Sequence, residues 1–129
     1  MIKRFENIQR GYYLVGGKQR FFRSKWEANV ALYLNFLVKQ KEIKNWEYEP
    51  TSFLFEKIKS GTRLYRPDFK VFKNDNSFEF WEVKGWMDSR SLTKLKRMKK
   101  YYPAIKIILI EKDTYYDIRN KIGRVLKFY

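Results

Sequence analysis

The segments RPDFK (residues 66–70) and FWEVKG (residues 80–85) decide the fold of this chain. Both are rich in aromatic and β-branched residues, a composition typical of β-strands. Asn74-Asp75-Asn76 between them is a turn-forming sequence, so the two segments are predicted to form a hairpin. Each segment also carries one acid, Asp68 or Glu82, among apolar neighbours. A bare charge in such a place is costly unless it has a partner.

The register of the hairpin follows from its turn. In a hairpin centred on Asp75, Asp68 lies seven residues before the centre and Glu82 seven residues after it, so the two acids face each other. Opposed residues have Cβ atoms about 4.5–5.5 Å apart and point to the same face. Lys84 follows two residues later and shares that face. Two bare carboxylates repel, whereas Mg²⁺ prefers such oxygen ligands. The register therefore predicts a divalent-metal site beside Lys84.

Composition limits the chemistry that is available. The chain has no cysteine and no histidine. This excludes disulfides, thiolate or imidazole zinc sites, histidine-dependent nuclease centres and Ser-His triads. Any catalysis must then use carboxylates and lysine. With 29 Lys and Arg against 14 Asp and Glu, the formal charge is +15, which favours a polyanionic partner such as nucleic acid.

The 129 residues most simply form one domain, with a basic and aromatic N-terminal arm (1–22, containing a short hairpin), a core (24–110) and a C-terminal segment (111–129). The predicted elements of the core and the C-terminal segment are a helix from Ser24 to 39–41, strands over 46–49 (resuming at 52–55), 63–73, 77–85 and 105–110, and helices over 91–102 and 114–127. The order is α-β-β-β-α-β-α. A last strand reached through a helix indicates an α/β fold with a mixed sheet flanked by helices.

The first helix supplies another acid. Ser24 and Glu27 have the spacing of a capping box, which predicts the start of the helix. Glu27 also lies three and seven positions before the apolar residues Val30 and Leu34, so it belongs to the core-facing stripe. An acid there could reach the edge of the metal site. The capping box alone also accounts for Glu27, and both interpretations stay open.

These residues resemble the PD-(D/E)xK nuclease superfamily. Pro67-Asp68 matches the "PD", Glu82-Val83-Lys84 matches the "(D/E)xK", and Glu27 matches the glutamate often found on the first helix. The order of elements over residues 24–110 is similar to the restriction-endonuclease-like αβββαβ core. The contexts RSKWEANVALYL and EVKGWMD are most similar to small phage and bacterial endonucleases, including junction-resolving enzymes.

The resemblance implies a Mg²⁺-dependent DNA endonuclease that hydrolyses phosphodiester bonds, with Mn²⁺ able to replace Mg²⁺. It implies Asp68, Glu82 and the Val83 carbonyl as metal ligands, Glu27 as a helper ligand or water-orienting acid, and Lys84 as the catalytic lysine. The short chain has little room for a sequence-reading domain, which favours branched or junction DNA as substrate. Site-specific nicking or homing-type cleavage is the alternative. Cutting both strands requires two chains, so a homodimer is expected. Phage replication or recombination proteins are further candidate partners.

Basic residues cluster in the N-terminal arm and on the second helix, where they can contact phosphates. The predicted nucleic-acid contacts are Lys18, Arg20, Arg23, Arg66, Lys94, Lys96, Arg97, Lys99 and Lys100. Phe21 and Phe22 lie within the N-terminal cluster and could either stack on exposed bases or belong to the core.

Other functions stay open. The chain could be a non-catalytic nucleic-acid-binding module that keeps a nuclease fold, or an RNA-associated basic protein. Asp68 could cap a turn after Pro67 and Glu82 could be a solvated edge-strand acid, although neither explains why all three charges share a face. Lys84 could also simply pair with Glu82. Glu47 and Glu49 could be solvated or could supplement the metal site. The N-terminus lacks an apolar signal core and the chain has no membrane-spanning stretch, so we expect a cytoplasmic protein of a bacterial host or phage, without membrane partners.

Overall fold

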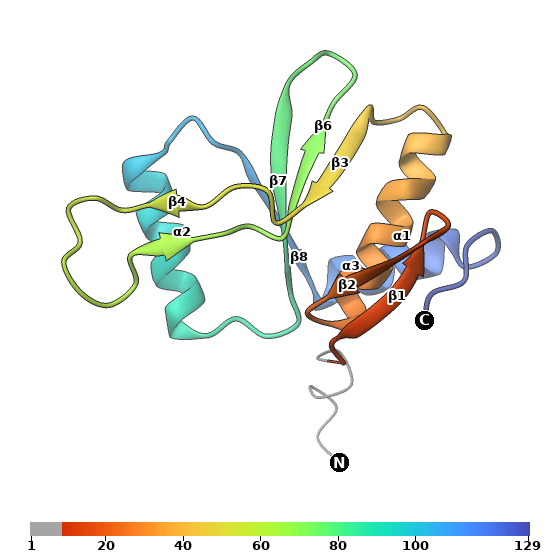
Figure 1. Cartoon of the computed structure of the whole chain (residues 1–129), viewed down its shortest axis with the longest axis horizontal. Helices are drawn as coiled ribbons and strands as arrows, with labels where there is room; N and C mark the ends of the chain where they lie inside the picture. The colour runs from red at the N-terminus through yellow and green to blue at the C-terminus, as the bar shows by residue number, and fades with distance from the viewer. Residues whose placement is uncertain (1–8) are drawn as a thin grey trace.

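A four-stranded mixed sheet lies between two groups of helices and hairpins (Figure 1), and this confirms the predicted α/β fold class. The computed structural model describes residues 9–129. Its elements are β1 (Gly11–Val15), β2 (Lys18–Phe22), α1 (Lys25–Lys39), β3 (Asn45–Tyr48), β4 (Phe53–Leu54), β5 (Leu64–Tyr65), β6 (Phe69–Phe72), β7 (Phe78–Lys84), α2 (Ser89–Tyr101), β8 (Ile107–Glu111) and α3 (Lys112–Ile122). No helix among these has the length and apolarity needed to cross a membrane.

The central sheet has the strand order β3-β6-β7-β8. β3, β6 and β7 pair in antiparallel fashion, and β8 returns through α2 to lie parallel to β7. The hairpins β1–β2 and β4–β5 are separate two-stranded sheets. Apart from these two hairpins, the helices and strands follow the predicted order, α-β-β-β-α-β-α.

The β6–β7 hairpin has the predicted register. Lys70 pairs with Phe80 and Phe72 pairs with Phe78, so the turn is centred on Asp75. The Asp75 carboxylate accepts a hydrogen bond from the Ser77 amide at 2.9 Å. Asn76 has φ +71°, a left-handed conformation that asparagine tolerates. The turn chemistry therefore fixes which residues oppose each other along both strands.

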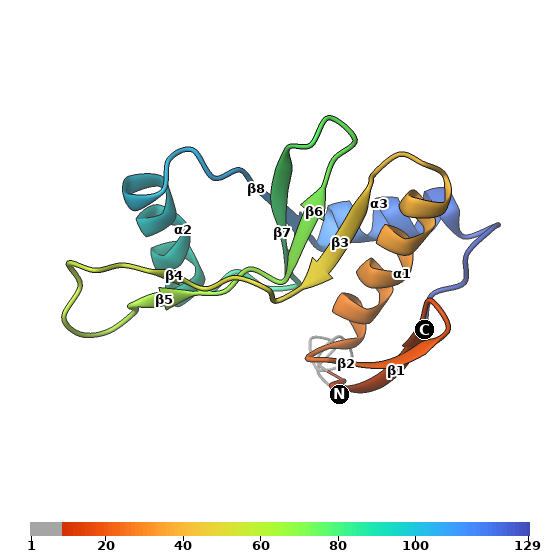
Figure 2. The same ribbon diagram turned by 45° about the horizontal axis from the view of Figure 1, so that its top comes forward.

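Alternation along β7 separates the two faces of the sheet. Val83 belongs to the larger apolar cluster, together with residues of α1, α3, β1 and β2. Phe80 belongs to a second cluster with the β4–β5 hairpin and Met98 of α2. Glu82 and Lys84 are spaced by two from Phe80 and lie on that second face. Figure 2 shows the same division, with α2 and β4–β5 on one side of the sheet and α1, α3 and β1–β2 on the other.

Two predicted strands were wrong in their extent or their pairing. The segment 63–73 breaks at residues 66–68, because Pro67 lacks the N–H that a ladder requires. Its first part, β5, pairs with β4 away from the central sheet. The predicted interruption at Pro50 is present, and Glu49 has φ +48° there, but the part after it, β4, pairs with β5 and not in the central sheet. The break at residues 66–68 places Asp68 immediately before β6 and not inside a continuous strand.

The helices deviate less from the prediction. Ser24 caps α1, and its hydroxyl accepts a hydrogen bond from the Glu27 amide at 3.1 Å. α2 begins two residues early, at Ser89, because Asp88 caps it. α3 ends at Ile122 and not at residue 127, with Gly123 following. The predicted N-terminal arm contains the β1–β2 hairpin, while residues 1–8 lie outside the described part of the chain.

Asn29 of α1 joins three elements. It is fully buried, and its amide nitrogen donates to the Tyr115 hydroxyl of α3 at 2.7 Å. Its side-chain oxygen accepts from the Tyr129 backbone amide at 2.8 Å. Trp26, one helical turn before, stacks on Tyr115 at 4.0 Å. The helix that begins beside the carboxylates is thus fixed to α3 and to the C-terminal residues.

We expect Asn29→Ala to lower the free energy of unfolding by about 1–3 kcal/mol, because buried hydrogen-bonding groups lose their partners. Urea denaturation measures the difference. Asn120→Ala, at an exposed position of α3, is the matched control and is expected to change stability little. Equal effects of the two substitutions would contradict the structural role given to Asn29.

Candidate active site

Asp68, which immediately precedes β6, lies opposite Glu82 of β7. The Asp68 carboxylate accepts a hydrogen bond from the Val83 amide at 2.7 Å. The Glu82 carboxylate accepts one from the Asp68 amide at 3.3 Å. The two residues are only 8% and 7% exposed. Phe69 and Trp81 are the last paired residues of the hairpin. Asp68 and Glu82 follow as the next opposed residues, as the predicted register requires.

Lys84 shares the face of Glu82. Its Nζ lies 3.6 Å from Glu82 Oε2, and its side chain remains 31% exposed. The Lys84 side chain therefore contacts Glu82 and is also partly exposed to solvent. One cation beside two acids leaves a net negative charge in this group.

Burial makes the ionised carboxylates unfavourable. The pKa of Asp68 is raised well above its usual range by desolvation, and then by the charges of Glu82 and Glu27, against the Val83 hydrogen bond and Lys84. The pKa of Glu82 is also raised by desolvation, while Lys84 and Tyr65 oppose the shift. A divalent cation between the two carboxylates would remove the repulsion and replace the lost solvation.

Glu27 approaches this pair from α1. It is buried, and its carboxylate accepts a hydrogen bond of 2.5 Å from the Tyr48 hydroxyl of β3. Desolvation raises the pKa of Glu27. Its charge is close enough to raise the pKa of Asp68. The structure thus brings the helix acid near the pair and gives it a tyrosine partner that the sequence did not indicate.

The three acids do not form one ligand cluster. Among residues 9–129, no group of three or more His, Cys, Asp or Glu side chains is placed to hold a metal ion. The donor set at the hairpin is therefore two carboxylates. Mg²⁺ is commonly bound by one or two carboxylates, with water or substrate oxygens completing its octahedron. The chemistry of Asp68 and Glu82 fits such a cation.

Tyr65 is a second residue that the sequence did not indicate. Its hydroxyl is buried and, within the described residues, is the one buried side-chain polar atom without a hydrogen bond of ordinary geometry. Desolvation, Glu82 and Asp68 raise the pKa of Tyr65, so the hydroxyl lies beside the carboxylates. Tyr65 belongs to β5, which the break at Pro67 separates from β6. No periodicity in the sequence connects it to Asp68.

The cations of α2 are divided between two surfaces. Lys94 lines a space with Tyr65, Glu82 and Lys84 that is too small for a water molecule. Lys96 and Lys99, in contrast, line an apolar groove with residues of β8. Lys94 is thus the predicted contact of this helix that lies closest to the carboxylates.

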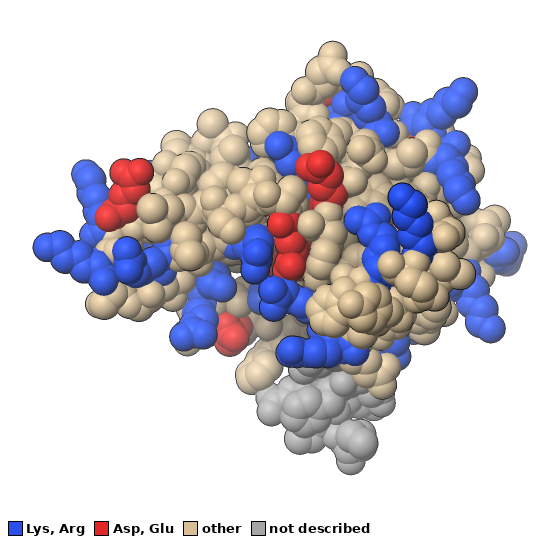
Figure 3. All heavy atoms as spheres, in the orientation of Figure 1, with Lys and Arg blue, Asp and Glu red and all other residues tan. Residues whose placement is uncertain are grey.

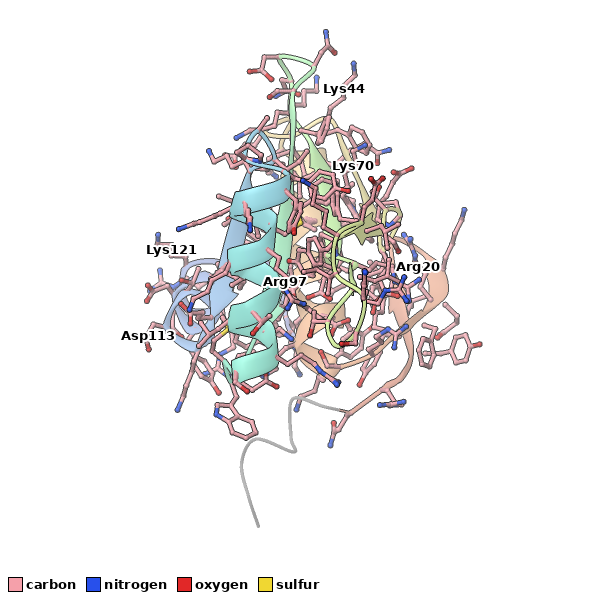
Figure 4. The ribbon with its side chains drawn as sticks, turned by 90° about the vertical axis from the view of Figure 1, so that its left-hand side faces the viewer. Arg20, Lys44, Lys70, Arg97, Asp113 and Lys121 are labelled. Carbon is pink, nitrogen blue, oxygen red and sulfur yellow. The ribbon has the colours of Figure 1, made fainter. Side chains whose placement is uncertain are left out.

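Other predicted contacts already have partners. Arg97 donates to the Thr62 carbonyl of the β4–β5 loop. Arg20 lies over the Trp46 ring at 4.5 Å, and Arg23 pairs with Glu49 at 2.8 Å. In Figure 4, Arg20 and Arg97 lie toward the face with the two hairpins, and Asp113 and Lys121 of α3 lie on the far side. The predicted contacts that are exposed are Lys18, Arg23, Arg66, Lys96, Lys99 and Lys100.

The two supplementary acids that the sequence left open are not equivalent. Glu49 is held by Arg23, whereas Glu47 is exposed on β3. Neither joins Asp68 and Glu82 in a three-acid group within the described residues. Figure 3 shows acidic side chains at the centre of the face seen in Figure 1, with Lys and Arg on both sides of them.

We expect Asp68→Asn to stabilise the metal-free protein by about 1–3 kcal/mol, because it removes one of two buried like charges and can keep the Val83 hydrogen bond. The pH dependence has a defined sign. Since folding raises the pKa of Asp68 and Glu82 above the ordinary 3.8 and 4.5, the folded chain binds protons more tightly. The free energy of unfolding should therefore fall as pH rises through and above these ordinary values.

Thermal unfolding between pH 4 and pH 8 in EDTA tests this, with Asp68→Asn expected to flatten the decline. Asp75→Asn, at the fully exposed turn of the same hairpin, is the control. A wild-type stability that rises with pH, or that declines no more steeply than that of Asp68→Asn, would contradict the expectation.

Comparison with known proteins places the chain in a family. No curated protein and no solved structure matched it. A family model did match, over residues 14–118, which include α1, the whole central sheet and α2. The matched segment contains Glu27, Asp68, Glu82 and Lys84 and covers most of the chain. The chain therefore belongs to the family described as "Protein of unknown function (DUF1064)".

Proposed function

We propose that this protein is a Mg²⁺-dependent endodeoxyribonuclease that hydrolyses phosphodiester bonds. The observation that carries the proposal is the buried, opposed pair of Asp68 and Glu82 with Lys84 3.6 Å from Glu82. Perturbed pKa values in such a group favour a functional site over a structural one.

The fold supports the same proposal. The chain has the element order and the "PD … ExK" residues that resemble the PD-(D/E)xK nucleases, with Asp68 immediately before β6 and Glu82 and Lys84 on β7. The helix acid Glu27 is also close to the pair. These are arguments from likeness, and they add to the geometry without replacing it.

The chain's own residues have separable roles in this proposal. Asp68 and Glu82 hold the cation, and the hydrogen bonds from Val83 and Asp68 amides fix the orientation of both carboxylates. A bound Mg²⁺ lowers the pKa of a coordinated water and offsets the charge that develops at phosphorus. Lys84, which is partly exposed, orients the attacking water and donates to a phosphate oxygen. Glu27 orients water from the edge of the site.

DNA is the proposed substrate because the chain carries a formal charge of +15 and because Lys and Arg side chains are spread over the face shown in Figure 3. Branched DNA is favoured over a defined sequence, since no part of the described chain forms a separate reading domain. A homodimer would place two such sites on the two strands.

We expect nicking of supercoiled plasmid in Mg²⁺ and no nicking in EDTA. Asp68→Asn, Glu82→Gln and Lys84→Met should each lower the rate by at least about 100-fold, because each removes a group that acts on the charge of the transition state. Asp75→Asn is the matched control and should cut like the wild type. Gel electrophoresis of plasmid and of a four-way junction measures both rate and preference.

Metal binding is measured separately from cutting. Mg²⁺ should raise the unfolding temperature of the wild type and of Asp75→Asn, and should not raise that of Asp68→Asn. DNA binding without cutting, together with no stabilisation by Mg²⁺ or Mn²⁺, would overturn the nuclease proposal. The same result would favour a nucleic-acid-binding module on this fold.

A further inference from the structure

The β1–β2 hairpin has one buried face and one exposed aromatic face. Tyr12 pairs with Phe21, and Leu14 pairs with Gln19, so these four side chains point the same way. Tyr12 is 72% exposed, Phe21 44% and Leu14 50%. The two aromatic rings are 5.6 Å apart in an edge-to-face arrangement. The ring that presents its edge keeps both of its own faces free.

The opposite face of the hairpin anchors it to the body of the protein. Val15 and Phe22 are buried in the larger apolar cluster. The Phe22 ring lies 4.8 Å from that of Tyr48. The structure therefore separates the two phenylalanines that the sequence could not tell apart: Phe22 belongs to the core, whereas Phe21 faces solvent. Because the anchoring does not use Tyr12 or Phe21, packing does not explain why this outer face is aromatic.

The exposed aromatic pair lies at the end of the hairpin near the carboxylates. Phe21 directly precedes Phe22, whose partner Tyr48 donates its hydroxyl hydrogen bond to Glu27. Leu14 and Gln19 lie one step closer to the turn at Gly16-Gly17. In Figure 1 the β1–β2 hairpin lies on one side of the converging ends of the sheet strands, and β4–β5 lies on the other.

The charged side chains of the hairpin segment itself are all positive. Residues 9–23 contain four cations and no acid. Within the described residues, Arg10 and Lys18 are exposed and form no ion pair with an acid, while Arg23 is held by Glu49. A second copy of this chain would bring the same cations against themselves. A polyanion that also presents flat apolar rings complements the surface better, and unpaired nucleotides have both properties.

We propose that Tyr12 and Phe21 stack on unpaired bases of the DNA, so that the substrate carries a single-stranded segment beside the strand to be cut. The inference rests on the proposed function for the identity of the ligand as DNA, and it deepens that function by naming the substrate class. Base stacking on aromatic rings tolerates any sequence, because every base has a π-face. The nearby cations would contact the phosphates of the same segment.

The test measures binding and not cutting. Full-length protein carrying Asp68→Asn is titrated, in EDTA, against three fluorescent DNAs: a blunt duplex, the same duplex with an unpaired tail, and the tail alone. Fluorescence anisotropy gives the three dissociation constants. Adding Tyr12→Ala and Phe21→Ala should weaken binding of the tailed duplex and of the free tail on the order of tenfold for each ring lost, and should change blunt-duplex binding less than about twofold.

Matched variants separate stacking from other contacts. Leu14→Ala with Gln19→Ala alters the same face without removing an aromatic ring and should leave tail binding unchanged. Tyr12→Leu with Phe21→Leu keeps an apolar surface but lacks π-faces, and should weaken tail binding as the alanine variants do. Tyr12→Trp should retain it, since indole stacks on bases at least as well as phenol.

Three results would overturn the inference. The first is an equal loss of affinity for the blunt and tailed duplexes on replacing Tyr12 and Phe21. The second is full tail binding by the leucine variants, which would indicate an apolar docking surface. The third is unchanged DNA binding combined with loss of a dimer in sedimentation, which would assign the face to a second copy. Failure of the wild type to cut any DNA, with tail binding still dependent on the two rings, would reject the nuclease and support the stacking surface.

Discussion

The burial of Asp68 opposite Glu82 is the constraint on which the candidate site depends. Two carboxylates cannot be buried side by side without cost, and nothing in the packing of the hairpin requires them there. Their backbone partners are nevertheless well defined, because the Val83 and Asp68 amides each donate to the opposite side chain. The hairpin therefore holds the two carboxyl groups away from solvent in a fixed geometry, with Lys84 offsetting only part of their unfavourable interaction. Such an arrangement is suited to a ligand that supplies positive charge.

The two faces of the central sheet differ in what they carry: one holds most of the apolar core, and the other holds the candidate site. The α1 face buries most of the apolar residues, and Asn29 joins that side to α3 and the C-terminal residues. The other face carries Glu82 and Lys84 on β7 and is covered by the smaller cluster of Phe53, Phe55, Tyr65, Phe80 and Met98. The fold tolerates the unfavourable burial of these charges on the second face, because the larger apolar cluster on the first face does not include them.

The sequence predicted the parts of this fold that follow from local rules. The turn at Asn74-Asp75-Asn76 determines the register of β6 and β7, and Ser24 determines the start of α1, since both signals act over a few residues. The β4–β5 pairing was not predicted, because Phe53 and Tyr65 meet across a long loop and their pairing depends on tertiary contacts rather than on a local turn signal. Tyr48 and Tyr65 were missed for the same reason. Their hydroxyls reach Glu27 and Glu82 only through tertiary contacts, and hydroxyls on strand residues leave no periodic signal.

The β4–β5 hairpin joins the rest of the molecule at its base, where Phe53 pairs with Tyr65 and Leu54 with Leu64. Its loop is held to α2 by the bond between Arg97 and the Thr62 carbonyl, and the Tyr102 hydroxyl contacts the Leu54 carbonyl near the base. Lengthening a surface loop adds little closure entropy, about 0.6 kcal/mol for each doubling. Residues 56–61 can therefore vary in length and sequence among related proteins without moving Tyr65 away from Glu82. Natural variation confined to that loop would alter the outer surface beside the proposed site while the positions of Tyr65 and Glu82 stay the same.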